Sequence, residues 1–407
     1  MPRSRVDRNG FFFFASYLAL GLGGLIYEPL GYFLKDTVKL SPDESSTFIF
    51  WMTFPFLLKP LYAAASDFFP WRGYRRRPQV VAACLVALAA WLGMAFFDVR
   101  SYAFLLAGLA AANLGSAAAD VIGNGVMVEQ GKLRGKTGFY QAIELGTLYA
   151  TIVVSNLAAG WLSKRVAIRG LFWVGAVLPA IVLAAVPLIE EPRVGPTFSK
   201  AVSGLEGLIR SRRFWALSAF IFLWSFTPFL GTAQFYYQSE ALGFSPLRIG
   251  GLSGVEGVCG SLGALVYARM LGRDWKASQI AKACVFAGAP LTLLYVFYVG
   301  PVSSVVVTAM TAFGGVALRL SLMDLAAQHS PEFGEATGFA IFMAVFDLAA
   351  SASNAVGGHL YGWLTRGMGE LPGPLPPYGA VCVLAGIGVV TTLCCWPLLR
   401  WVAREEA

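Results

Sequence analysis

The stretch YFLKDTVKLSP at residues 32–42 returns in altered form as YYQSEALGFSP at residues 236–246. Each copy begins with two aromatic residues, has an acid four positions after the first of them, and closes on Ser-Pro. The copies are 204 residues apart in a chain of 407 residues, which is half its length. This spacing predicts an internal duplication.

Further matches support the same division. They are TGF at 137–139 and 337–339, GWLSK at 160–164 with GWLTR at 362–366, and Asp120 with Asp324. We therefore expect a first bundle over 1–189 and a second over 214–407. The connection 190–213 has apolar residues at helical spacing beside basic ones, which predicts an amphipathic helix on the inner membrane surface or a simple linker.

The composition indicates an all-α membrane protein. Hydrophobic residues make up 57% of the chain and charged residues 13%, and the mean hydropathy is +0.64. Apolar stretches long enough to cross a bilayer as helices recur throughout. We expect twelve spans, near 11–34, 46–66, 78–97, 102–128, 137–162, 170–189, 214–238, 247–271, 279–298, 302–327, 337–364 and 378–401.

The basic residues predict the orientation. Of the 31 lysines and arginines, 20 lie in or beside the loops on the side that holds both termini, and eight lie on the other side. Positive loops remain cytoplasmic, so we expect both termini in the cytoplasm, with the protein in the plasma or inner membrane. The net charge of +8 then needs no nucleic-acid partner.

Two repeats of six spans have the same orientation, which is the parallel arrangement of the two halves of a major facilitator. This arrangement predicts a secondary transporter that works by alternating access, with a site between the halves near the midplane. We expect a monomer.

No sequence motif indicates an enzyme, a metal site or a cofactor. The six cysteines lie in apolar segments, and GKLRGKT at 131–137 is one residue short of a P-loop and lacks a preceding strand. A membrane-embedded enzyme and a transport-inactive receptor or scaffold are the alternatives from other classes.

The chain resembles the folate–biopterin transporter family of the major facilitator superfamily. The resembling stretches are YFLKDTVKLSP at 32–42, KPLYAAASDFFPWRGYRRRP at 59–78, FIFLWSFTPFLGTAQFYYQSEALGFSP at 220–246 and SPEFGEATGFA at 330–340. The resemblance implies transport of folates or pterins. Another small anionic or zwitterionic metabolite, such as an amino-acid derivative, S-adenosylmethionine or a glycoside, is the alternative cargo.

One resembling stretch is similar to the cytoplasmic signature loop of major facilitators. It contains Asp67, Gly73, Arg75, Arg76 and Arg77. The resemblance implies a gating loop that latches the two halves; fixing the topology is the simpler role. The chain departs from the family at Asn124, where a second acid is common, and at Asp347, where an uncharged polar residue is expected.

Charged residues within apolar spans are costly and need a partner or a purpose. We expect proton coupling or fixed intramembrane ion pairs from Lys59, Asp120, Glu144, Arg319, Asp324 and Asp347. Our hypothesis pairs Lys59 with Asp120 or Glu144, and Arg319 with Asp347, so that one carboxyl group is left to carry a proton.

The candidate substrate-binding residues combine carboxylates, aromatic rings and one arginine. A carboxylate matches the adjacent N–H donors of a pterin edge, a ring stacks on the pterin, and Arg319 can hold a folate carboxylate. The set is Glu28, Tyr32, Asp120, Glu144, Trp224, Phe229, Tyr236, Glu256 and Arg319, with Tyr27 and Phe235 as further stacking candidates. Packing is the alternative role for the aromatic residues.

Overall fold

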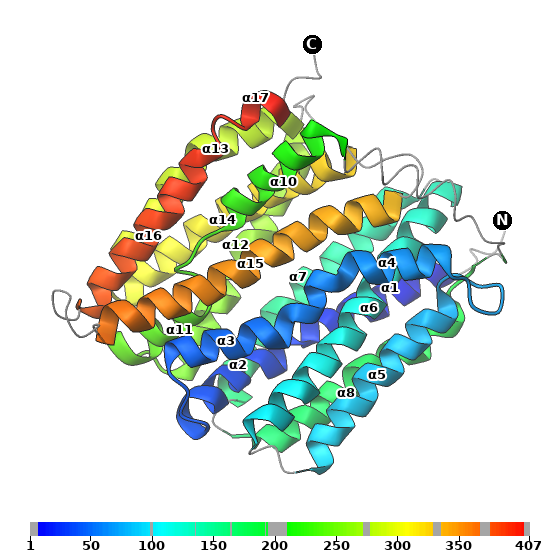
Figure 1. Ribbon diagram of the computed structural model, residues 1–407, viewed down its shortest axis with the longest axis horizontal. Coiled ribbons are helices and arrows are strands. Elements are labelled where there is room, and N and C mark those ends of the chain that lie inside the picture. Colours follow the sequence, from blue (N-terminus) through cyan, green and yellow to red (C-terminus); the bar gives the residue numbers. More distant parts are fainter. Residues whose placement is uncertain are drawn as a thin grey trace.

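The computed structural model is a set of long helices packed side by side (Figure 1). It describes residues 7–97, 101–134, 136–162, 165–191, 193, 210–271, 277–328, 335–366 and 375–402. In these ranges the one extended pairing is a single bridge between Trp71 and Tyr74. Residues 194–209, where the amphipathic linker helix was expected, lie outside the described residues.

We call residues 7–191 the first half of the chain and residues 210–402 the second half. The helices of the first half are α1 (Arg8–Leu22), α2 (Gly24–Tyr32), η1 (Phe33–Thr37), α3 (Pro42–Thr53), η2 (Phe54–Leu58), α4 (Lys59–Phe68), α5 (Arg77–Phe96), α6 (Tyr102–Arg134), α7 (Thr137–Leu162), α8 (Ile168–Ala185) and η3 (Val186–Leu188). Those of the second half are α10 (Arg212–Ser225), α11 (Thr232–Tyr236), η4 (Tyr237–Ala241), α12 (Pro246–Leu271), α13 (Ala277–Leu293), η5 (Leu294–Phe297), α14 (Pro301–Gln328), α15 (Glu335–Arg366), α16 (Pro377–Cys394) and α17 (Leu399–Val402).

Nine helical stretches of the described residues are long and apolar enough to cross a membrane, and each overlaps an expected span. The expected spans 137–162 and 279–298 coincide with shorter apolar stretches, Gly146–Leu162 and Val285–Phe297. The expected span 214–238 is broken between α10 and α11. Pro228 lies in this break and cannot donate a helical hydrogen bond, and Gly231 has a φ of +89°.

The duplicated stretches have the same unusual backbone. Each contains a π-helical turn, η1 and η4, with hydrogen bonds from Val38 N to Phe33 O and from Leu242 N to Tyr237 O, both of 3.0 Å. Lys39 and Gly243 follow with φ of +64° and +61°. The stretches also touch one another, since Lys35 Nζ donates to Ser239 Oγ over 3.0 Å and these positions are 204 apart.

The two halves meet along two seams, where α12 packs on α7 and α15 packs on α3 and α4 (Figure 1). Glycine permits the close approach in both seams. A Cβ at Gly160 would lie 2.7 Å from Pro246 O, and one at Gly362 would lie 3.1 Å from Asp43 Oδ1. These glycines come from the repeated GWL motif.

Each half buries two apolar clusters, one toward each end of the helices. Among the buried residues that the structure describes, Ala340 of α15 belongs to a first-half cluster and Tyr32 of α2 belongs to a second-half cluster. We call the end that holds Asp7 and Thr337 the terminal end, and the end that holds Asp43 and Arg366 the loop end. The described chain begins with α1 and ends with α17, and α17 packs on α10 (Figure 1).

Candidate functional site

A break in the second membrane-crossing segment positions the central cation. Lys59 is the first residue of α4 and follows the 3-10 turn η2. Pro55 and Pro60 flank this point, and because proline has no amide hydrogen, regular α-helical bonding cannot continue through it. The Lys59 ammonium also lies 5.1 Å from the centre of the Phe56 ring.

Lys59 holds two carboxylates, one from each half. Its Nζ lies 3.3 Å from Asp120 Oδ2 of α6 and 3.1 Å from Asp347 Oδ2 of α15. The side chains of Lys59, Asp120 and Asp347 are 14%, 15% and 26% exposed. Two acids therefore share one cation at the interface between the halves.

The expected Lys59–Asp120 pair is present, and the expected Arg319–Asp347 pair is wrong, because Asp347 is paired with Lys59. The expectation assigned a separate charge cluster to each half. In the structure, α15 packs along α4 of the other half and brings its aspartate to Lys59. Arg319 instead lies over the Phe346 ring, 5.5 Å from its centre.

A polar chain leads from Asp120 into a cavity inside the first half. Asn124 Nδ2 donates to Asp120 Oδ1 over 3.3 Å, and Tyr17 OH donates to Asn124 Oδ1 over 2.9 Å. The cavity has a volume of about 110 Å³ and is also lined by Glu144. Glu144 is 4% exposed, and its Oε1 has no hydrogen-bond partner among the described residues.

A larger cavity of about 460 Å³ lies in the second half. Glu256, Arg319 and Asp347 line it together with Trp224 and Gln234. Glu256 and Arg319 both belong to the exposed residues of the described chain and both line this cavity.

Two hydroxyl groups in the wall of this second-half cavity make no hydrogen bond to the described residues. Ser225 Oγ and Thr308 Oγ1 are buried and make no hydrogen bond among the described residues. Buried polar atoms are almost always satisfied, so these two are available to a ligand or water.

A third cavity of about 300 Å³ lies between the halves. Tyr27, Glu28 and Asn156 line it from the first half, and Gln234 and Phe235 line it from the second. Gln234 also lines the second-half cavity, so the two spaces adjoin.

Three of the expected stacking residues line none of these three cavities. Phe229 is fully buried and packs 5.1 Å from the Tyr295 ring. Tyr32 packs edge-on against Phe235, with ring centres 4.9 Å apart. Tyr236 is buried and bonded to the loop that precedes α3. We therefore retain Tyr27, Trp224 and Phe235 as the aromatic candidates.

The expected gating loop contacts the second half at the terminal end. Asp67 Oδ1 accepts from Arg76 Nη2 over 2.9 Å, and Asp67 Oδ2 accepts from Thr337 Oγ1 of α15 over 2.8 Å. Arg76 is 5% exposed and also lies 3.4 Å from Glu129 Oε2. Gly73, with φ of +80°, allows the sharp turn.

Comparison with known proteins decides the family. A family model described as the BT1 family matches residues 20–406. The chain belongs to the BT1 family. It is 28% identical over 371 residues to the folate-biopterin transporter of Synechocystis, which covers 86% of this chain and 74% of that protein. It is 32% identical over 180 residues to probable folate-biopterin transporter 4 of Arabidopsis thaliana, covering 43% of this chain and 36% of that protein.

Solved structures support the fold of this BT1-family protein. The nucleoside transporter NupG superposes with a TM-score of 0.71 at 12% identity, covering 97% of this chain and 99% of that one. An auto-inhibited POT family peptide transporter gives 0.70 at 13% identity, covering 99% and 98%. The all-helical fold expected from the sequence is confirmed for the described residues, and family and apolar helices together indicate an integral multi-pass membrane protein.

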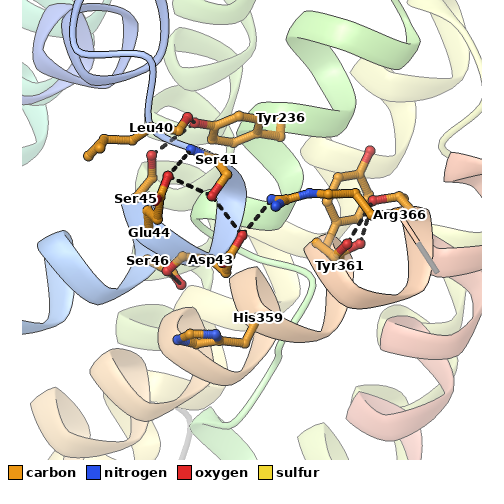
Figure 2. A network of polar contacts seen from close by, with 12 residues as sticks. Leu40, Ser41, Asp43, Glu44, Ser45, Ser46, Tyr236, His359, Tyr361 and Arg366 are labelled. Atoms are coloured by element: carbon orange, nitrogen blue, oxygen red, sulfur yellow. Dashed lines mark hydrogen bonds and ion pairs between the residues drawn. The ribbon is translucent and has the colours of Figure 1, made fainter. Parts of the chain in front are cut away.

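A polar cluster that was not predicted from the sequence joins the two halves at the loop end of this BT1-family protein (Figure 2). Arg366 of α15 pairs with Asp43 of α3, and Tyr236 donates to Leu40 O. His359 Nε2 lies 2.9 Å from Thr47 Oγ1. The repeated motif GWLTR at 362–366, which ends at Arg366, was the available signal for this cluster.

Two further unpredicted groups act at the terminal end. Glu191 accepts from the backbone amides of Arg75 and Arg76 over 2.7 and 2.9 Å, which fixes the gating loop. Asp7 caps α1 and accepts from Lys136 Nζ over 2.8 Å. Burial raises the pKa of Asp7, but hydrogen bonds from Lys136, Gly10 N and Tyr140 outweigh this and lower it overall.

The side chain of Asp324 on α14 lies outside the described part of the structure. Its expected role in proton coupling stays a prediction.

Proposed function

We propose that this protein is a secondary active transporter of folates and pterins, driven by protons and working by alternating access. Its membership of the BT1 family and the names of its relatives support this cargo. We further propose twelve spans in two six-helix repeats, 1–189 and 214–407, with both termini in the cytoplasm of a plasma or inner membrane. The observation that supports this mechanism is that Lys59 forms an ion pair with an aspartate of each half.

Alternating access requires contacts between halves that break at one end while the other end stays closed. Asp43–Arg366 and Lys35–Ser239 close the loop end, and Asp67–Thr337 joins the halves at the terminal end. Each of these is a hydrogen bond or ion pair at the end of a helix, where a rocking motion displaces the groups most.

The charge balance around Lys59 supports proton coupling. Two carboxylates and one ammonium leave one negative charge in excess, and an unbalanced charge inside a membrane is costly. A proton on Asp347 removes that excess and leaves Lys59 with Asp120 alone. The link between the halves is then weaker, so protonation favours their relative motion.

Uptake of labelled folate into proteoliposomes tests this function. We expect an inward proton gradient to accelerate uptake, and unlabelled biopterin to compete. S-adenosylmethionine, amino acids and sugars serve as the competing cargoes. Competition by one of these without competition by biopterin would assign the protein to the alternative cargo, and gradient-independent uptake would contradict proton coupling.

A further inference from the structure

The cavity between the halves contains an acid suited to a nitrogen heterocycle. Glu28 of α2 lines it, and its Oε1 is buried without a hydrogen-bond partner among the described residues. Tyr27 of the first half and Phe235 of the second half add aromatic rings to the lining, and Gln234 and Asn156 add amides. A carboxylate, amides and aromatic faces together suit a flat ring with N–H donors and acceptors.

The second-half cavity contains a cation suited to an anionic group. Arg319 is exposed to it, and no carboxylate of the described side chains lies within 4.0 Å of its guanidinium. The guanidinium carbon lies 5.5 Å from the centre of the Phe346 ring, within cation–π range. An arginine in this position binds a carboxylate through two parallel hydrogen bonds.

The two groups lie at different depths. Glu28 is nine residues before the end of η1 at Thr37, which places it about 13 Å below the loop end at 1.5 Å per residue. Arg319 is 18 residues into α14 from Pro301, which places it about 27 Å below that end. The difference of about 14 Å exceeds the span of one fused ring pair and suits a ring that carries an extended tail.

We propose that the site has two parts, a ring subsite at Glu28 and an anion subsite at Arg319, joined at Gln234. The protein then selects a nitrogen heterocycle with a carboxylate-bearing tail over the heterocycle alone. This inference rests on the proposed function and deepens it, because it predicts a preference for folate over biopterin, which carries no carboxylate.

Measuring the binding of folate and biopterin to purified protein in detergent tests whether the site is divided into a ring subsite and an anion subsite. Arg319→Gln should lose at least about tenfold more affinity for folate than for biopterin, because it removes a charge-assisted contact to the tail only. Glu28→Gln should weaken both ligands by similar factors. Arg319→Lys keeps the charge and should fall between wild type and Arg319→Gln.

Arg248→Gln is the matched control, since Arg248 is an exposed arginine near the loop end that lines none of the three cavities. Equal losses of both ligands in Arg319→Gln, or no loss in either, would overturn the division. Wild-type protein that binds neither ligand would instead overturn the proposed function.

A second measurement needs no variant. In a two-part site, biopterin and p-aminobenzoylglutamate, the tail fragment of folate, should each displace labelled folate without displacing one another. Mutual displacement of the two fragments would contradict separate subsites even if every Arg319 variant failed to fold.

Discussion

Lys59 Nζ lies 3.1 Å from Asp347 Oδ2 and so joins an α4 side chain of the first half to an α15 side chain of the second. The same ammonium lies 3.3 Å from Asp120 within its own half. The lysine is therefore the common member of two ion pairs. Replacing Lys59 therefore breaks both ion pairs, whereas replacing one aspartate breaks only one of them.

Lys59→Met should destabilise the protein more than Asp347→Asn. The first change leaves two carboxylates without their cation, and breaking a buried pair in this way costs about 3–5 kcal/mol. The second change leaves the Lys59–Asp120 pair in place. Thermal unfolding in detergent measures both, and equal effects would mean that Lys59 is not the shared partner.

Thr337→Val should loosen the terminal end, because it removes the hydroxyl that donates to Asp67 while keeping the volume of the side chain. We expect a cysteine placed at Ala340, in the apolar cluster beside this contact, to react faster with a water-soluble thiol reagent. Thr337→Ser keeps the hydroxyl and is the control. The same labelling rate in both variants would show that the Asp67–Thr337 bond does not hold this end closed.

Adjacent glycines of α12 offer a matched test of the α7–α12 seam. A Cβ at Gly250 would lie 2.8 Å from Asn156 O, whereas one at Gly251 would meet nothing within 4 Å. Gly250→Ala should cost about 1–3 kcal/mol by overpacking, and Gly251→Ala should be neutral or slightly stabilising because alanine favours the helix. Denaturation in detergent measures the stability of the two variants. If Gly250→Ala is as stable as wild type, the α7–α12 seam is packed more loosely than the structure shows.

The capping carboxylate Asp7 should make the stability of the terminal end depend on pH. Its pKa is lowered in the folded protein, so its stabilising contribution is present above the unfolded value and is lost as the pH falls through the folded one. Asp7→Asn keeps a good helix cap but removes the charge. The variant should unfold at a lower temperature than wild type at neutral pH, and the difference should disappear in acid. A constant difference at all pH values would contradict the charge-based account.

Local repeats were the most predictable feature of the sequence. The similar stretches 32–42 and 236–246 both contain a π turn followed by a left-handed residue, so their sequence similarity is matched by a similar local backbone. The Lys59–Asp120 pair was also predictable, since both charges belong to one half and need a partner. Asp347 was assigned wrongly because no local pattern states which helix of the other half it will meet.

The sequence predicted least well which aromatic residues line the cavities. Phe229 and Trp224 occur in one apolar stretch, yet the first is in the core and the second lines a cavity. The amino-acid type alone does not distinguish a core residue from a cavity-lining residue, because large aromatic side chains occur in both places. Thr337 and Glu191 were missed for a related reason: a threonine and a glutamate near a membrane surface are ordinary until the fold places them beside Asp67 and the arginine loop.

Proton movement during folate uptake tests the shared-lysine mechanism most directly. Proteoliposomes containing a pH-sensitive dye would report proton entry while labelled folate enters. We predict that wild-type protein moves protons together with folate, and that Asp347→Asn binds and exchanges folate but moves no protons with it. Wild-type folate entry without proton entry, or unchanged proton entry in Asp347→Asn, would contradict a mechanism in which protonation at the Lys59–Asp347 link drives transport.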